Sequence, residues 1–263
     1  MIYRLGKKPP VHDERTLKLA HYTAALPPLP PEASYFPKVS YPMFGNDTLG
    51  DCVAAAAGHM IEAWTYSAGK GIIPTLANVL KFYQFSGWNP SDPSTDQGWD
   101  ILAMMKKFRT VGLGGDKIVA FVQLAPGNWN QLKQSIALFG SVCLGFALPD
   151  AVVPQVPGSD WTKIPWKWAP GMTPNQDNGH CVSAMAYTAT GWADFESWAA
   201  RMGFNQEFYE NTSDEGYAAV TMDFINANGK SPSGFDIAQL LADLAVVTAA
   251  IDPASTPRSH YWG

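Results

Sequence analysis

The most informative segment of the 263-residue sequence is residues 45–64, GNDTLGDCVAAAAGHMIEAW. Its alanine run predicts a helix from Asp51 to Trp64, because alanine has the highest helix propensity and an aspartate can cap the first turn. Cys52 then lies in that first turn. The positive end of the helix dipole favours a thiolate there, whereas the charge of Asp51 opposes it. Cys52 therefore has two interpretations: a nucleophile, or a small core residue, which is the commoner role of a cysteine in such a helix.

A second segment, residues 179–187 (GHCVSAMAY), supplies a base for that nucleophile. Its alternating pattern predicts a strand, and His180 stands at the start of this strand. A histidine in this position either faces a cleft or makes a structural hydrogen bond. A Cys–His couple needs side chains that are adjacent in space, not in sequence, so Cys52 and His180 are interpreted as a pair. His59 lies two helical turns beyond Cys52, roughly 10 Å away, and is interpreted as a core histidine.

The remaining elements follow from hydrophobic periodicity. Apolar residues at helical spacing predict helices at 74–85, 100–108, 129–139 and 235–247, and apolar or alternating runs predict strands at 141–148, 181–187 and 217–224. Helices that largely precede strands indicate an α+β fold with two lobes. Residues 1–32 are rich in proline and predict an extended arm, which either lies over the domain surface or binds a partner.

Several segments, in this order along the chain, resemble papain-like (C1-type) cysteine peptidases. Asn46 stands six residues before Cys52, where that family has a glutamine that donates to the oxyanion. The stretch 95–99 is similar to the glycine-rich stretch that lines the family's substrate cleft, and Gly179-His180 is similar to its histidine strand. The family's Asn-Ser-Trp is matched by Glu196-Ser197-Trp198. The resemblance covers about residues 30–225 and extends to a looser group of bacterial and phage-borne members with a Gly-Asp-Cys turn.

The resemblance implies a two-lobed papain-like α+β fold. A helical lobe at about 45–140 would carry Cys52, and a β-rich lobe at about 141–225 would carry His180. A peptide substrate would bind between the lobes. The expected division of the chain is an arm at 1–32, this domain at 33–225, and a C-terminal extension with one amphipathic helix at 226–263.

The resemblance also implies a mechanism. His180 takes the proton of Cys52, and the thiolate attacks an amide carbonyl, while Asn46 and the Cys52 N–H stabilise the oxyanion. Glu196 orients the imidazole, and Trp198 shields that contact from water. The expected substrate is a peptide or protein, bound by Gly98 and Trp198. No cofactor and no metal ion is expected.

The sequence departs from the family at several of these positions. Asn46 is one methylene shorter than glutamine, Glu196 is charged, Asp51 replaces a small neutral residue, and Leu49 stands where the family has a disulfide cysteine. If residues 193–202 are helical, Glu196 points away and Asp194 becomes the orienting group. Two alternatives therefore stay open. One is a catalytically weak or inactive papain-like module that serves as a structural component of an assembly such as a phage particle. The other is a peptidoglycan hydrolase, for which the spacing between Cys52 and His180 is too long.

Composition and charge limit the classes of binding partner and the compartment that we expect. Hydrophobic residues make up 46% and charged residues 16% of the chain, and the net charge is −5, with no run of basic residues longer than two. Nucleic acid and anionic membranes are therefore not expected as partners, whereas other subunits of an assembly could bind the arm and the C-terminal helix. Three cysteines and the absence of a secretory signal pattern predict reduced thiols and a cytoplasmic or virion-associated protein.

Overall fold

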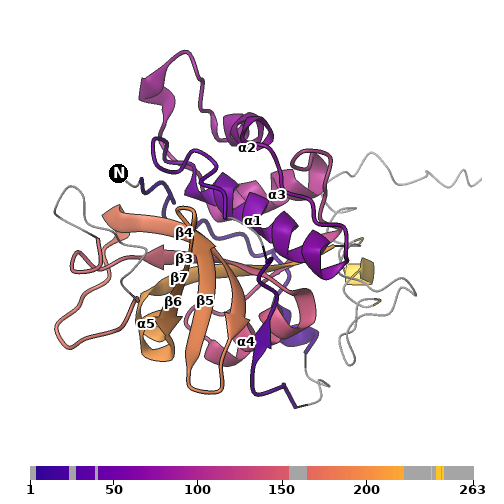
Figure 1. Ribbon diagram of the computed structural model, residues 1–263, viewed down its shortest axis with the longest axis vertical. Coiled ribbons are helices and arrows are strands. Elements are labelled where there is room, and N and C mark those ends of the chain that lie inside the picture. The colour runs from indigo at the N-terminus through magenta and orange to yellow at the C-terminus, as the bar shows by residue number, and fades with distance from the viewer. Residues whose placement is uncertain are drawn as a thin grey trace, which may run out of the picture.

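The computed structural model describes residues 4–23, 28–38, 41–153, 165–221, 238, 241–243 and 245. These residues form one antiparallel sheet with helices packed on both of its faces (Figure 1). The α+β class predicted from the sequence is confirmed. Within the described residues, no helix is both long enough and apolar enough to cross a membrane.

Five α-helices are described. Their bounds are α1 Cys52–Ser67, α2 Leu76–Tyr83, α3 Ile101–Thr110, α4 Trp129–Phe139 and α5 Gln206–Thr212. Four of them begin at a side-chain cap, for example Asp100, which accepts from the Ala103 N–H, and Asn128, which accepts from the Gln131 N–H. Helix α1 differs because its first fourteen residues are all buried, as expected of a helix that is apolar around its whole circumference.

Asp51 does not cap α1 as the sequence predicted. It occupies the N-cap position, but its side chain makes no capping hydrogen bond and is fully buried. Burial raises the pKa of Asp51 well above its usual value. Burial thus disfavours the charged form of Asp51, although its proximity still contributes to the raised pKa of Cys52.

The sheet has the strand order β2-β7-β3-β4-β5-β6, with the short β1 paired to β4. The bounds are β1 Ala33–Ser34, β2 Ala120–Gln123, β3 Val142–Ala147, β4 Gly179–Tyr187, β5 Trp192–Ser197, β6 Ala200–Asn205 and β7 Ser213–Val220. Strands β3 and β4 are buried along their whole length, which explains their nearly continuous apolar sequences. Strands β5 and β6 form a hairpin through the two-residue turn Trp198-Ala199, where φ is 49° and 59°.

Strand alternation divides the interior into two cores. Cys143, Cys181 and Tyr217 face helices α1–α3, whereas Val142, Val182 and their neighbours face α4 and α5. Because α4 packs in this second core, it lies with the sheet and not with the helical lobe expected at 45–140 (Figure 1).

The N-terminal arm is held by backbone contacts. The Gln123 N–H donates to the Leu17 carbonyl at 2.7 Å, and directly after the arm the short strand β1 pairs with β4. The predicted C-terminal extension at 226–263 lies largely outside the described residues. Positions 238, 241–243 and 245 are helical, and the Tyr22 hydroxyl donates to Asp243 Oδ2 at 2.8 Å.

Candidate active site

Cys52 lies in the first turn of α1, with 1% of its surface exposed. Burial raises its pKa above the usual value for a thiol, and the backbones of Cys181 and Gly6 lie close enough to oppose that rise. The thiol of Cys52 is therefore protonated in this conformation. Its neighbour in sequence, Asp51, adds to the rise in the pKa of Cys52, but burial raises the pKa of Asp51 as well.

His180 is the second residue of β4 and is completely buried. Its ring stacks on the indole of Trp198, with centroids 4.0 Å apart and an interplanar angle of 15°. Its Nε2 lies 2.9 Å from the Ser197 hydroxyl oxygen, whereas its Nδ1 has no hydrogen-bond partner. Burial lowers the pKa of His180 to about 3, so the ring is neutral. No hydrogen bond joins this ring to the Cys52 thiol, although both residues lie against the same N-terminal segment.

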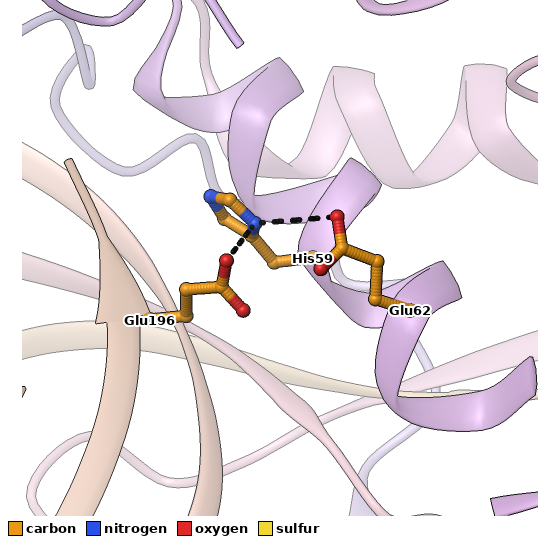
Figure 2. Close-up of side chains that lie close together, drawn as sticks. All are labelled: His59, Glu62 and Glu196. Atoms are coloured by element: carbon orange, nitrogen blue, oxygen red, sulfur yellow. Dashed lines mark ion pairs between the residues drawn. The ribbon is translucent and has the colours of Figure 1, made fainter. Parts of the chain in front are cut away.

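The prediction that Glu196 orients His180 is wrong. Glu196 Oε1 lies 2.8 Å from His59 Nδ1, on the side of the sheet that faces α1 (Figure 2). Successive strand residues point to opposite faces, so Ser197 is the residue that reaches His180. The substitute Asp194 binds Arg201 at the surface. If residues 192–197 are recognised as a strand, the alternation of side chains between its two faces identifies Ser197 as the residue on the side of His180.

Asn46 and Trp198, two predicted site residues, meet at one backbone carbonyl. Asn46 Nδ2 and Trp198 Nε1 each donate to the Arg4 carbonyl oxygen at 3.3 Å. Asn46 Nδ2 also donates to the Leu49 carbonyl at 3.1 Å. The amide of Asn46 is thus positioned to donate to a carbonyl oxygen between the lobes, in spite of its short side chain.

The segment Arg4–Lys8 runs between the two lobes and bonds to both. The Gly6 and Lys7 N–H groups donate to the Gly179 carbonyl at 3.2 and 3.1 Å, next to His180. On the other lobe, Trp99 N–H donates to the Gly6 carbonyl at 2.9 Å, and Lys8 N–H donates to the Trp99 carbonyl at 3.0 Å. Every predicted site residue except Glu196 is therefore in contact with this segment or adjacent to a residue that binds it.

Glycines allow the backbones to approach this closely. A Cβ atom added to Gly6 would lie 1.9 Å from the Gly50 carbonyl oxygen, and one added to Gly98 would lie 2.0 Å from the Gly6 oxygen. Gly98 also has a φ of +71°, which other residues rarely adopt. Gly98, predicted as a substrate-binding residue, here makes room for the N-terminal segment.

Lys7 anchors the segment, and sequence reasoning did not single it out. Its side chain is 0% exposed, with Nζ 2.9 Å from Asp214 Oδ2 and 3.4 Å from Glu215 Oε1 at the start of β7. Burial raises the pKa of Glu215 to about 7, although the charge of Lys7 opposes the rise. Lys7 and Lys8 lie in a proline-rich arm, and no local sequence pattern there predicts these contacts.

Comparison with solved structures gives the class of fold: it is that of the papain-like cysteine proteases. The chain is similar over most of its length to xylellain, a cysteine protease from Xylella fastidiosa, with 16% identity, a TM-score of 0.66, and coverage of 84% of this chain and 97% of that one. The ragweed Amb a 11 cysteine protease in its proform has 13% identity, a TM-score of 0.52, and coverage of 76% and 67%. Digestive procathepsin L 3 of Tenebrio molitor has 11% identity, a TM-score of 0.51, and coverage of 83% and 75%. No family model and no curated protein matches the sequence.

Proposed function

We propose that this protein is a cysteine peptidase held in a latent form by its own N-terminal residues 4–8. The observation that carries the proposal is the path of this segment, which hydrogen-bonds to Asn46, Trp198, Trp99 and Gly179. These residues lie around the Cys52–His180 pair, where a peptide substrate would bind. A peptide backbone thus bonds to the residues that the proposed mechanism assigns to substrate binding, which supports the proposal.

The same segment accounts for latency. With it in place, burial keeps the Cys52 thiol protonated and the His180 ring neutral. Withdrawal of the segment readmits water, which removes the desolvation that disfavours both charged forms. The helix dipole at the start of α1 then favours the thiolate.

The chemistry proposed for the open form uses residues of both lobes. His180 Nδ1, which has no hydrogen-bond partner, accepts the proton of Cys52, and the thiolate attacks the substrate carbonyl. Asn46 Nδ2 and the Cys52 N–H donate to the oxyanion, and His180 then protonates the leaving amine. Water hydrolyses the resulting thioester. Ser197 and Trp198 hold the imidazole in position throughout.

Two of the similar structures support this interpretation, since one is of a proform and the other is of a procathepsin. In this chain the corresponding element would be the N-terminal arm. Because the arm is bound largely through backbone groups and Lys7, the preferred substrate sequence is not defined by it.

The test adds one methyl group at position 6, which sterically displaces the segment. Gly6→Ala places a Cβ atom 1.9 Å from the Gly50 carbonyl, so the segment has to move away from Cys52. The variant should hydrolyse a library of fluorogenic peptides that the wild type leaves intact, while Lys8→Ala, whose side chain is partly exposed, should behave as the wild type does. Adding Cys52→Ala or His180→Ala to Gly6→Ala should remove the activity.

Labelling with iodoacetamide makes a negative result informative. If Gly6→Ala makes Cys52 accessible to the reagent but the variant hydrolyses no peptide, the peptidase assignment fails. The fold would then serve as a binding or structural module. If Cys52 stays protected in Gly6→Ala, the proposed role of the segment in latency is wrong.

A further inference from the structure

Three ionisable side chains outside the Cys52–His180 pair converge in the interior (Figure 2). His59 and Glu62 lie three residues apart on α1, so they project from the same face of the helix, and Glu196 reaches them from β5. Their side chains are 2%, 0% and 0% exposed, respectively. One ligand atom from each of the three lies within 4.8 Å of the others.

The two carboxylates of this cluster lack hydrogen-bond partners among the described residues. Neither oxygen of Glu62 or of Glu196 makes a hydrogen bond. His59 Nδ1 lies 2.8 Å from Glu196 Oε1 and 3.9 Å from Glu62 Oε1. It forms a hydrogen bond with neither oxygen. An N–H bond in the plane of the imidazole ring would therefore not point at either of them.

Apart from His59 itself, no side-chain cation among the described residues pairs with the two carboxylates. Among the described residues, no lysine or arginine forms an ion pair with Glu62 or Glu196, and the nearby Arg201 binds Asp194 instead. Burial of unpaired carboxylates is strongly unfavourable, and native structures normally pair such groups or use them to bind a metal ion. A bound metal ion would give these oxygens the partner that they lack.

We propose that His59, Glu62 and Glu196 bind a divalent transition-metal ion of the zinc type. Zinc accepts imidazole nitrogen at about 2.0–2.1 Å and carboxylate oxygen at about 2.0–2.2 Å, usually with tetrahedral geometry. Tetrahedral ligands at such distances lie about 3.3–3.5 Å apart, and the observed separations of 2.8 and 3.9 Å lie on either side of that value. Small side-chain adjustments would bring the three ligand atoms, which lie within 4.8 Å of one another, to these separations.

The ligand set distinguishes between cations. Calcium takes about 6–8 oxygen ligands and magnesium keeps several waters in octahedral geometry, which three buried side chains do not provide. One imidazole and two carboxylates suit zinc, cobalt or manganese, and zinc has the highest affinity of these in the usual order for divalent ions. A water molecule would complete the fourth position.

The metal site would link helix α1, which carries Cys52, to the end of β5, next to the residues that hold His180. His59 is seven residues after Cys52 on the same helix, roughly 10 Å along its axis, so the metal ion would not touch the nucleophile. Glu196 directly precedes Ser197 and Trp198, which hold His180. The ion would therefore fix α1 to the β5–β6 turn and act as a structural tie, independently of whether the peptidase assignment is correct.

The first experiment is equilibrium dialysis of the full chain against Zn²⁺, followed by metal analysis and thermal unfolding. We expect one equivalent per chain, and a Tm higher by about 5–10 °C at a hundredfold excess of zinc over Kd. Glu62→Gln and Glu196→Gln preserve shape and should each weaken binding by about a hundredfold or more. The control Glu207→Gln, at an exposed position of α5, should retain the equivalent. If a glutamine variant fails to fold, chelation of the zinc-loaded wild type provides the second measurement, and it should reverse the gain in Tm.

The second experiment separates this site from the thiols. Co²⁺ should give the visible absorption of a tetrahedral nitrogen–oxygen site, without a near-ultraviolet sulfur-to-cobalt charge-transfer band, and Cys52→Ser should leave that spectrum unchanged. A charge-transfer band, binding unaffected by Glu62→Gln, or no retained zinc would each overturn the proposal. In those cases the cluster would be stable without a metal ion, and Glu62→Gln would be as stable as the metal-free wild type.

Discussion

Replacing Lys7 by methionine should open the N-terminal segment while leaving the rest of the fold intact. Methionine has a similar length but no charge, so Asp214 and Glu215 lose the ammonium group that lies 2.9 and 3.4 Å from them. Removal of one partner of a buried ion pair costs about 3–5 kcal/mol. The lower end applies here, because Asp214 is 14% exposed and Glu215 can take up a proton. About 3 kcal/mol corresponds to roughly a hundredfold rise in the open population.

The assay is the rate of alkylation of Cys52 at pH 8, measured by mass spectrometry with Lys8→Met as the control. The ratio of variant to wild-type rate should be about a hundred. Since burial raises the pKa of Glu215 to about 7 even beside Lys7, the ratio should shrink at pH 6, where Glu215 already carries a proton. Equal rates for Lys7→Met and Lys8→Met would refute the reasoning. So would a parallel rise at Cys143 and Cys181, since both are buried in the core and react only on global unfolding.

Three further outcomes are expected. In the Gly6→Ala background, Ser197→Ala should lower kcat/KM about tenfold, because one net hydrogen bond to His180 is worth about 1–1.5 kcal/mol; an unchanged value would show that Ser197 does not orient the ring. The buried His180 has its pKa lowered from 6.5 to about 3, so the unfolded state binds more protons between these values and stability falls as pH falls. Between pH 7 and pH 4, urea titration should show the wild type losing about 3 kcal/mol more than His180→Gln, and equal losses would contradict this. Gly58→Ala places a Cβ 2.7 Å from the Phe44 ring and should lower Tm by about 3–10 °C in calorimetry, despite alanine's higher helix propensity; a raised Tm would show that the ring moves freely.

Local patterns are sufficient to predict the central elements. The helix predicted at Asp51–Trp64 is α1, Cys52–Ser67, and the helix predicted at 129–139 has the bounds of α4. Strands β3 and β4 are also predicted, because they are buried on both faces and their apolar runs are bounded by proline- and glycine-containing segments. In these elements, propensity, periodicity and burial all favour the same structure.

The β5–β6 hairpin is not predicted from the sequence, and the error in the site follows from it. The Trp198-Ala199 turn has positive φ at both residues but lacks the Asn-Gly or Asp-Gly pair that normally marks such a turn. The sequence of residues 193–202 is therefore compatible with a helix, and it does not reveal the alternation that directs Glu196 and Ser197 to opposite faces. Sequence reasoning consequently assigns Glu196 to the wrong histidine.

Contacts between distant segments have no local signature. Lys7 reaches β7 near the other end of the described chain, and Glu196 reaches His59 from another lobe. Neither pairing is visible in periodicity or spacing, because each depends on how the sheet packs against α1. The resemblance to a known fold predicts the lobes but not these contacts, since none of its quoted motifs includes Lys7 or His59.

Because residues 4–8 belong to the same chain as the lobes that they bond to, their binding is an intramolecular equilibrium. The effective concentration of this segment near Cys52 is set by the length of chain between Lys8 and the contact of Leu17 with β2, and it does not change on dilution. Short tethers of this kind give effective concentrations in the millimolar range, so even weak contacts keep the segment bound. A single cut between residues 8 and 17 would convert residues 4–8 into part of a separate peptide that dissociates on dilution. The susceptibility of that short stretch to cleavage would then decide when Cys52 becomes accessible.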